Sequence, residues 1–330
     1  MDEFEVNPAS TMFCLILLIL PLAVFSASPL VQNHVQWHSF LVTHNKTYSS
    51  QAEYSKRLGI FMENLKFAKE RSKIEEGTAT FGWNKFSDMT PEEFQKTYLM
   101  NSKLLERKTP NKTSSLPFRS KGKLTLPSHF DWRDKGKVTE VKNQQGCGSC
   151  WAFSATGTME SVYAVRRGKL TSLSEQQLLD CSSGTCDGGW PVDALRDVVT
   201  WGGDESESAY PYEGQRETCR KRSSKYAERI DGVRELPEDE DAIAEYLAQH
   251  AFNGRDSILH YHGGIIKLSN CPSVFNHAVT LVGFGTENGV PYWIAKNSWG
   301  RNWGENGYFR IYRGGNACGI AVHAVSAVVN

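Results

Sequence analysis

Hydrophobic residues between positions 50 and 75 recur every three or four residues, which is the spacing of one face of an α-helix. The repeating positions are Tyr54, Leu58, Phe61, Leu65 and Ala68. Ser50 and Glu53 have the spacing of a capping box at the start of this helix, and Gly77 is a stop signal beyond its end. We therefore expect residues 28 to about 100 to be largely helical.

Beyond residue 125 the apolar pattern first predicts helices. They are expected in the segments CWAFSATGTMESVYAVRR, SLSEQQLLDC and PVDALRDVVTWGG. Gly168 and Gly202 follow the first and third segments as stop signals, and Pro191 stands at the first position of the third. Ser174 and Gln177 have the capping-box spacing in the second.

The last third of the chain has the pattern of strands. These are expected in HAVTLVGFG, VPYWIAKNS and GYFRIYRG. Asn288-Gly289 separates the first two and favours a tight hairpin turn. A helical half followed by a half rich in strands indicates an α+β arrangement.

The chain also divides into three segments by composition. Residues 12–25 are almost wholly apolar, too short for a comfortable membrane span, and followed by small residues, so residues 1–27 are expected to be a signal peptide. The acidic stretch before them leaves open a start at Met12, and a membrane anchor is the alternative. Residues 101–125 are basic and aperiodic, which predicts an exposed linker. This divides the rest into 28–125 and 126–330.

Charge limits the partners that can be expected. The formal net charge is +0 for 330 residues, which gives no reason to expect nucleic acid or an anionic membrane. Residues 28–125 hold 16 Lys/Arg and 9 Asp/Glu, whereas residues 126–330 hold 21 and 25. The two parts therefore have opposite charge, which suits an association between them.

The cysteines leave several kinds of site open. Cys14 lies in the expected signal peptide, and seven remain, so in an oxidising compartment six would pair and one would stay free. A zinc site could be drawn from four of them: Cys147, Cys150, Cys181 and Cys186. The signal peptide and the spacing disfavour it. A redox pair of Cys147 and Cys150 would need a surrounding βαβ unit, which the pattern does not predict.

Nucleophilic catalysis explains Cys150 better. At the start of a helix, free backbone N–H groups and the helix dipole favour a thiolate. His277 begins one expected strand and Asn297 ends the next, so a hairpin would bring them side by side. An imidazole oriented by an amide could then act as the base for the thiol.

These residues lie within motifs that resemble the papain family of cysteine proteases. The motifs are FDWRD, VKNQQGCGSCWAF, SLSEQQLLDC, CDGGWP, YPYEG, NHAVTLVGFG and KNSWGRNWGENGYFRIYRG. His277 and Asn297 follow Cys150 by 127 and 147 residues, close to the roughly 130–150 typical of the family. The resemblance implies an α+β, papain-like two-lobe fold, with a helical lobe, a β-barrel lobe and a helical inhibitory propeptide before them.

The resemblance also implies the roles of individual residues. Gln144 and the backbone N–H of Cys150 would stabilise the oxyanion. Substrate would be bound by Gly148, Gly188, Gly189, Trp190 and Pro191, with Trp299 covering the hydrogen bond between His277 and Asn297. The pocket beside Trp190 would prefer a bulky apolar side chain. The disulfides would be Cys147–Cys186, Cys181–Cys219 and Cys271–Cys318, with Cys150 free. No cofactor or metal is implied.

The first part of the chain resembles the propeptide of such zymogens, in the branch similar to cathepsin F. Ala68 and Ser72 stand where Ile and Asn are common, and GTATFGWNKFSDMT matches a second propeptide motif. The propeptide would lie backwards in the cleft and be released when acid protonates carboxylates that pair it with the enzyme. Asn45 and Asn111 lie in N-x-T sequons and are expected to be glycosylated.

The function implied is a cysteine endopeptidase made as a precursor, working in a lysosome or after secretion. Its expected partners are polypeptide substrates, its own propeptide and cystatin-like inhibitors, with no membrane anchor.

Two departures from the family pattern raise an alternative. Gln145 stands where the family usually has Gly and is expected to crowd the oxyanion loop. After His250 about five residues are missing relative to the family pattern, which predicts that one strand of the barrel is lost. The alternative function is therefore a non-catalytic relative that binds or inhibits proteases, and a gene-model error would explain the gap equally well.

Overall fold

The computed structural model describes residues 29–101, 103, 126–247, 252–255, 258–267 and 276–330. The expected signal peptide, nearly all of the expected linker, Asn111 and Cys271 lie outside the described residues. Four elements of the described residues precede the linker: α1 (Pro29–Thr43), α2 (Gln51–Ile74), β1 (Ala79–Phe81) and α3 (Pro91–Tyr98). The prediction of a largely helical unit is confirmed, with one short strand added.

The start of α2 differs in detail from the expected capping box. Ser50 Oγ accepts a hydrogen bond from the backbone N–H of Glu53 at 3.2 Å. The Glu53 carboxylate instead accepts from Arg57 Nε at 2.6 Å. Arg57 also donates to Glu93 of α3 at 2.6 Å and 3.1 Å. The Glu53 carboxylate therefore does not cap α2 but holds Arg57, which joins α2 to α3. After the helix, Gly77 has a positive φ of 82°, which fits its expected role as a stop.

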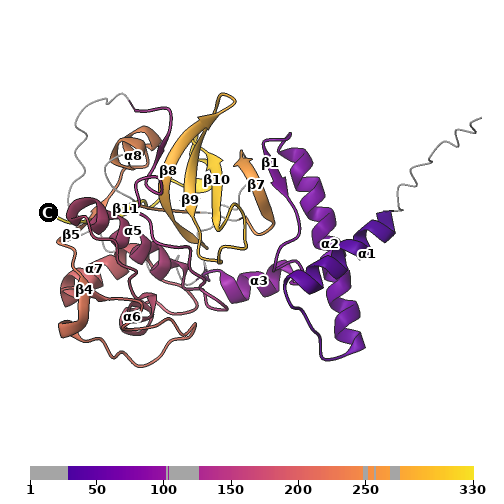
Figure 1. Ribbon diagram of the computed structural model, residues 1–330, viewed down its shortest axis with the longest axis horizontal. Helices are drawn as coiled ribbons and strands as arrows, with labels where there is room; N and C mark the ends of the chain where they lie inside the picture. Colours follow the sequence, from indigo (N-terminus) through magenta and orange to yellow (C-terminus); the bar gives the residue numbers. More distant parts are fainter. Residues whose placement is uncertain (1–28, 102, 104–125, 248–251, 256–257, 268–275) are drawn as a thin grey trace, which may run out of the picture.

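The main sheet contains the expected strands. It runs in the order β1-β7-β10-β9-β8-β2, and its strands after β1 are β2 (Phe130–Asp131), β7 (Tyr261–Ile266), β8 (Ala278–Glu287), β9 (Val290–Lys296) and β10 (Tyr308–Tyr312). Asn288 and Gly289 have φ values of 51° and 77° between β8 and β9, which confirms the expected turn. β1 pairs antiparallel with β7, so the N-terminal part adds an edge strand to the β-rich lobe (Figure 1).

The expected loss of a barrel strand is wrong. Strand β6 (Phe252–Arg255) directly follows the shortened segment and pairs antiparallel with β8, from Phe252 opposite Leu281 to Arg255 opposite Ala278. β2 pairs with the next part of β8, at Gly283 and Phe284. The four residues of β6 therefore provide backbone hydrogen-bond partners for the first part of β8. The shortened segment is still long enough to supply this strand.

The remaining elements form the helical lobe, join the two lobes, or pack against the apolar cluster of the β-rich lobe. They are α5 (Cys150–Arg167), α6 (Glu175–Cys181), α7 (Pro191–Trp201), β3 (Asp204–Glu205), η2 (Ser223–Lys225), β4 (Tyr226–Glu228), β5 (Gly232–Glu235), α8 (Glu240–Leu247), η3 (Ala317–Gly319) and β11 (Val325–Val328). The expected stops are present, since Gly168 and Gly202 end α5 and α7 with φ of 74° and 86°. Ser174 caps α6 through its Oγ, whereas the Gln177 amide donates to Gly203 O instead.

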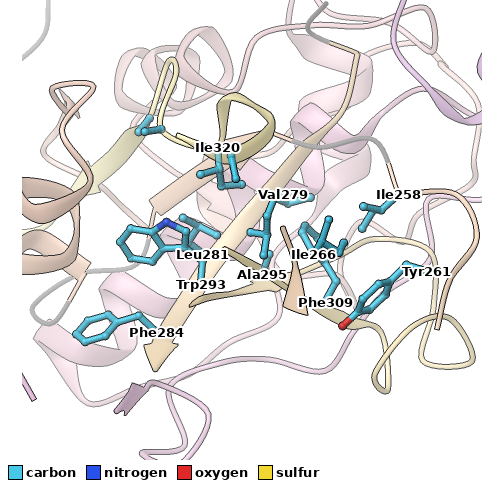
Figure 2. Packing of buried hydrophobic residues seen from close by; sticks show 14 of the residues in the cluster. Ile258, Tyr261, Ile266, Val279, Leu281, Phe284, Trp293, Ala295, Phe309 and Ile320 are labelled. Carbon is cyan, nitrogen blue, oxygen red and sulfur yellow. The ribbon is translucent and has the colours of Figure 1, made fainter. Parts of the chain in front are cut away.

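The packing of α5 against β8 determines where the lobes meet. Gly157 allows the close approach, because a Cβ at this position would lie 2.7 Å from Thr280 Oγ1. Buried apolar residues of the β-rich lobe form a large cluster that includes Val279, Leu281, Trp293 and Phe309 (Figure 2). This packing sets the first turn of α5 against the first residues of β8.

Candidate active site

Cys150 is the first residue of α5 and is completely buried. Its Sγ accepts a hydrogen bond from the backbone N–H of Ala278, at 3.4 Å. Ala278 begins β8 and follows His277 directly. The contact between α5 and β8 thus brings the thiol next to a histidine that is 127 residues away in the sequence.

His277 and Asn297 lie side by side because β8 and β9 are paired. His277 Nε2 and Asn297 Oδ1 are 2.8 Å apart, and Asn297 Oδ1 also accepts the backbone N–H of Ser298. Since Oδ1 is the acceptor, Nε2 carries the hydrogen in this bond, and Nδ1 makes no hydrogen bond to any described residue. The Trp299 ring covers the imidazole, with the two centroids 4.6 Å apart.

Gln144 has an oriented side-chain amide. Ser298 Oγ donates to Gln144 Oε1 at 2.7 Å, which fixes which end of the amide can donate. Gln144 Nε2 then donates to Cys147 O at 2.7 Å and to Tyr98 O at 2.8 Å. Tyr98 belongs to α3, so a carbonyl of the N-terminal part occupies the amide expected to bind an oxyanion.

Burial keeps the thiol and the imidazole uncharged in this state. Burial raises the pKa of Cys150 to about 12, although backbone N–H groups, including that of Ala278, act in the opposite direction. Burial also lowers the pKa of His277 to about 4, and its bond to Asn297 offsets only part of this effect. Both shifts disfavour a thiolate–imidazolium pair in this state of the protein.

The segment after α3 fills the rest of the site. The backbone N–H of Met100 donates to Asn276 O at 2.8 Å, and that of Asn101 donates to Asp187 O at 2.7 Å. Gly148 has no room for a side chain, since a Cβ would lie 2.8 Å from Leu99 O. The chain therefore bridges the two lobes by main-chain hydrogen bonds.

The expected pocket residues separate into two groups. Met100 is fully buried in one apolar cluster with Trp190, and it packs against Gly188, where a Cβ would come within 3.0 Å of the Met100 Cβ. Pro191 is also buried, at the start of α7. Gly189 instead makes room for the Trp151 ring, which a Cβ would approach to 2.7 Å. Gly189 thus supports the packing behind the pocket.

The cysteines are arranged as the resemblance implies, as far as they are described. Cys147–Cys186 and Cys181–Cys219 are disulfides, and Cys150 is a free thiol. Cys318 is disulfide-bonded, and its expected partner Cys271 lies outside the described residues.

Gln145 does not crowd the site. It has a positive φ of 55°, the conformation that favours glycine, but its side chain is exposed and lies toward Gly214. The expected crowding is therefore wrong, because this backbone conformation turns the side chain outward. Asn45, one of the two expected glycosylation sites, is also exposed.

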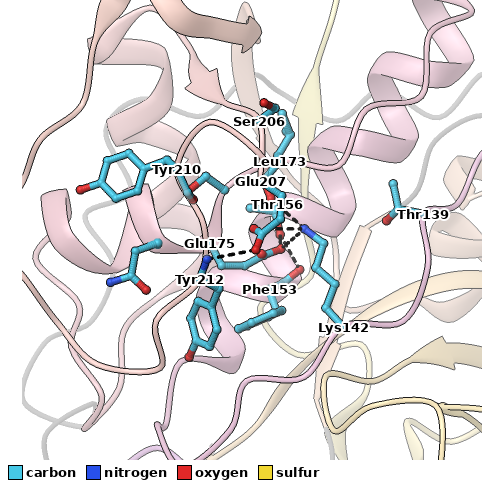
Figure 3. A network of polar contacts seen from close by, with 12 residues as sticks. Thr139, Lys142, Phe153, Thr156, Leu173, Glu175, Ser206, Glu207, Tyr210 and Tyr212 are labelled. Carbon is cyan, nitrogen blue, oxygen red and sulfur yellow. Dashed lines mark hydrogen bonds and ion pairs between the residues drawn. The ribbon is translucent and has the colours of Figure 1, made fainter.

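Several residues near the site were not predicted. Lys142 lies two residues before Gln144, and its Nζ donates to Glu175 at 2.7 Å (Figure 3). It also donates to the buried Glu160 at 3.1 Å. Burial would lower the pKa of Lys142, but the two carboxylates outweigh it and raise that pKa. Ser298 and Tyr212 also contact Gln144. Their positions in the motifs KNSWGRNWGENGYFRIYRG and YPYEG were the only sign in the sequence that they lie near the site.

One group among the described residues has the spacing of metal ligands. His129, Asp131 and Asp134 place their ligand atoms within 4.8 Å of one another. Both oxygens of Asp131 already accept from Arg133, at 2.6–3.0 Å, so this carboxylate has its charge paired. None of the described helices has both the length and the apolar character needed to cross a bilayer.

Family models match two segments of the chain. Residues 126–328 match the model described as papain family cysteine protease, and residues 37–94 match the cathepsin propeptide inhibitor domain (I29).

Individual relatives and solved structures agree with these matches. The chain is 43% identical over 300 residues to cathepsin F of Mus musculus, covering 88% of this chain and 64% of that protein. It therefore spans less than two thirds of that relative. It is 41% identical over 316 residues to pro-cathepsin H of Bos taurus, covering 92% and 91%. The structure of digestive procathepsin L 3 from Tenebrio molitor larval midgut superimposes with a TM-score of 0.79, at 39% identity, covering 90% of this chain and 99% of that one.

Proposed function

The chain belongs to the papain family of cysteine proteases and carries a cathepsin propeptide inhibitor domain, and we propose that it is the precursor of an endopeptidase with Cys150 as nucleophile. The proposed divisions are a signal peptide at 1–27, the propeptide at 28–125 and the peptidase domain at 126–330. The observation that carries the proposal is the convergence of Cys150, His277 and Asn297 from three distant segments.

In the proposed reaction Cys150 Sγ attacks the scissile carbonyl carbon, and the thiol proton passes to His277. The carbonyl oxygen, now negative, accepts hydrogen bonds from the Gln144 amide and the backbone N–H of Cys150. His277 gives its proton to the leaving amine, which leaves a thioester on Cys150. Water, deprotonated by His277, then hydrolyses the thioester and restores the thiol.

Asn297 acts on this reaction by orienting the imidazole. Its Oδ1 holds Nε2, so Nδ1 is the nitrogen that exchanges protons with the sulfur. Trp299 covers the Nε2–Oδ1 bond and excludes water from it. An amide can hold the ring in both protonation states, because it does not itself change charge.

The propeptide inhibits by occupying the substrate's positions. Its Tyr98 carbonyl accepts from Gln144, Met100 lies in the apolar pocket beside Trp190, and Asn101 pairs with Asp187. The substrate class that fits this site is a polypeptide with a bulky, unbranched or aromatic apolar side chain in the Trp190 pocket. The non-catalytic alternative loses its basis, since β6 completes the ladder of β8.

Compartment and further partners follow from the same proposal. A zymogen with disulfides and an exposed N-x-T sequon at Asn45 suits a lysosomal or secreted protein. Cystatin-like inhibitors would enter the cleft that the propeptide vacates.

The proposal can be tested by acid activation of the full chain, followed by titration with an irreversible epoxide inhibitor. We expect one inhibitor to bind per molecule, at Cys150 by peptide mapping, and peptide hydrolysis to be lost in proportion. Cys150→Ser is the matched variant, and it should process only when active enzyme is added. A folded, processed protein that is not labelled at Cys150 would contradict the proposal.

A further inference from the structure

The Tyr212 hydroxyl lies between two residues of the oxyanion loop, which we define as residues 144–149. It donates to the backbone carbonyl of Gln144 at 2.8 Å, and its oxygen is 2.7 Å from Ser149 Oγ. A phenol has one hydrogen and a carbonyl can only accept, so the Ser149 hydroxyl is the donor in the second bond. One oxygen atom therefore links the first and last residues of the loop.

These two residues carry or precede the two proposed oxyanion donors. Gln144 supplies its side-chain amide, and Ser149 directly precedes Cys150, which supplies its backbone N–H. An oxyanion is stabilised only when both donors lie within hydrogen-bond distance of the same oxygen. The separation of the two ends of the loop thus decides how well the donors fit the transition state.

Tyr212 is itself held by the helical lobe. Its ring meets Phe153 of α5 edge to face, with centroids 4.9 Å apart. Its backbone N–H donates to Glu207 Oε1 at 3.0 Å (Figure 3). The next residue, Glu213, donates its backbone N–H to Gln176 of α6 at 2.8 Å. The hydroxyl is consequently placed by a rigid surrounding, independently of the loop that it contacts.

We propose that Tyr212 is a positioning residue of the oxyanion hole, which sets the distance between the Gln144 amide and the backbone N–H of Cys150 without touching the substrate. This inference rests on the proposed roles of Cys150 and Gln144. Ser149 is the second half of the same link.

Tyr212→Phe tests the link in the activated enzyme, because it removes one oxygen and keeps the ring. The edge-to-face contact of the ring with Phe153 does not involve the hydroxyl, so the packing of the ring is retained. We expect kcat for peptide hydrolysis to fall about tenfold with KM nearly unchanged, as one hydrogen bond that acts in the transition state would give. Alkylation of Cys150 by iodoacetamide should keep its rate and pH profile, because displacement of iodide forms no oxyanion.

Tyr210→Phe is the matched control. Tyr210 lies two residues earlier, is buried, and donates its hydroxyl to Asp180 Oδ2 at 2.7 Å. Loss of the Tyr210 hydroxyl should leave kcat unchanged. Ser149→Ala should lower kcat in the same way as Tyr212→Phe, and it also provides the test if Tyr212→Phe fails to fold. The double variant should be no slower than the slower single one.

Two results would overturn the inference while leaving the proposed function intact. One is an unchanged kcat in Tyr212→Phe. The other is a loss of alkylation equal to the loss of hydrolysis, which would show that the whole site is disturbed. Absence of alkylation in the wild-type enzyme would instead remove the proposed nucleophile, and this inference with it.

Discussion

The propeptide and the peptidase domain are stabilised by different means. The propeptide's own core contains four buried residues: Trp37, Phe40, Phe61 and Leu65. Other buried apolar residues of the propeptide, such as Phe86 and Phe94, join the cluster of the peptidase domain around Trp299. Met100 joins the separate cluster that includes Trp190. The disulfides between described residues all lie in the peptidase domain. The propeptide therefore depends on the surface that it inhibits, whereas the peptidase domain has a core of its own.

Many polar contacts between the two parts involve a backbone group on at least one side. Gly82 donates its backbone N–H to His260 O at 3.0 Å, and the Asn84 amide donates to Leu259 O at 2.6 Å. Ion pairs of the propeptide between described residues, such as Lys46 with Asp88 and Arg57 with Glu93, remain inside it. The opposite net charges of the two parts thus do not form ion pairs between their described residues. One propeptide carboxylate does lie at the interface, since Glu75 is 3% exposed and its Oε2 accepts the backbone N–H of Lys267 at 2.8 Å. Release by protonation of carboxylates therefore stays a prediction.

The largest effect is expected from Phe61→Ala. Phe61 is fully buried between Trp37 and Phe40, with ring centroids 5.2 Å and 5.0 Å away. Its truncation should destabilise the propeptide by about 3–5 kcal/mol, more than so small a core can tolerate. The zymogen should then process itself near neutral pH, as measured by active-site titration over time. Ile74→Ala, at an exposed position at the end of the same helix, should process as the wild type does. Equal stability of the two variants would show that docking alone holds the propeptide together.

A smaller effect, on the peptidase domain, is expected when Cys181 and Cys219 are both replaced by Ser. This disulfide joins residues 38 positions apart. Its loss should lower the free energy of unfolding of the peptidase domain by about 2–4 kcal/mol. Calorimetry of the zymogen should show the peptidase transition at lower temperature and an unchanged pH for processing. A shift in the processing pH would mean that the two parts do not behave as separate units.

The smallest effect is expected from His260→Leu. The quantity measured is the pH at which processing of the zymogen is half complete. His260 lies just before β7, packs edge to face on Phe67 of α2 at 6.1 Å, and is 4% exposed. Burial lowers its pKa from 6.5 to about 4, and no charged group among the described residues contributes to the shift. The docked state thus binds fewer protons than the separated one. Docking is fully stable above about pH 6.5 and weakens as the pH falls toward 4.

Leucine cannot bind that proton, so the midpoint of processing should move down by about half a pH unit. The measurement is active-site titration after incubation between pH 7.5 and pH 4. His262→Leu is the control, because His262 is exposed on the same strand. An unchanged midpoint in His260→Leu would assign the acid response to other groups.

Local patterns in the sequence were sufficient to predict many elements. The glycine stops of α5 and α7, the Asn288-Gly289 turn and the helix start at Cys150 each depend on a few adjacent residues, and all are present. Spacing and motif resemblance also selected Cys150, His277 and Asn297, which the structure brings together.

Tertiary structure decided what depends on neighbours that are distant in the sequence. The strand after the gap could not be predicted, because β6 exists only as a partner of β8. The raised pKa of Cys150 and the lowered pKa of His277 result from burial in the tertiary structure, which no local pattern records. The link from Tyr212 to Gln144 joins residues 68 positions apart. Helices, caps and turns follow from contacts within a few residues, whereas strand pairing, burial and protonation depend on which distant surfaces meet.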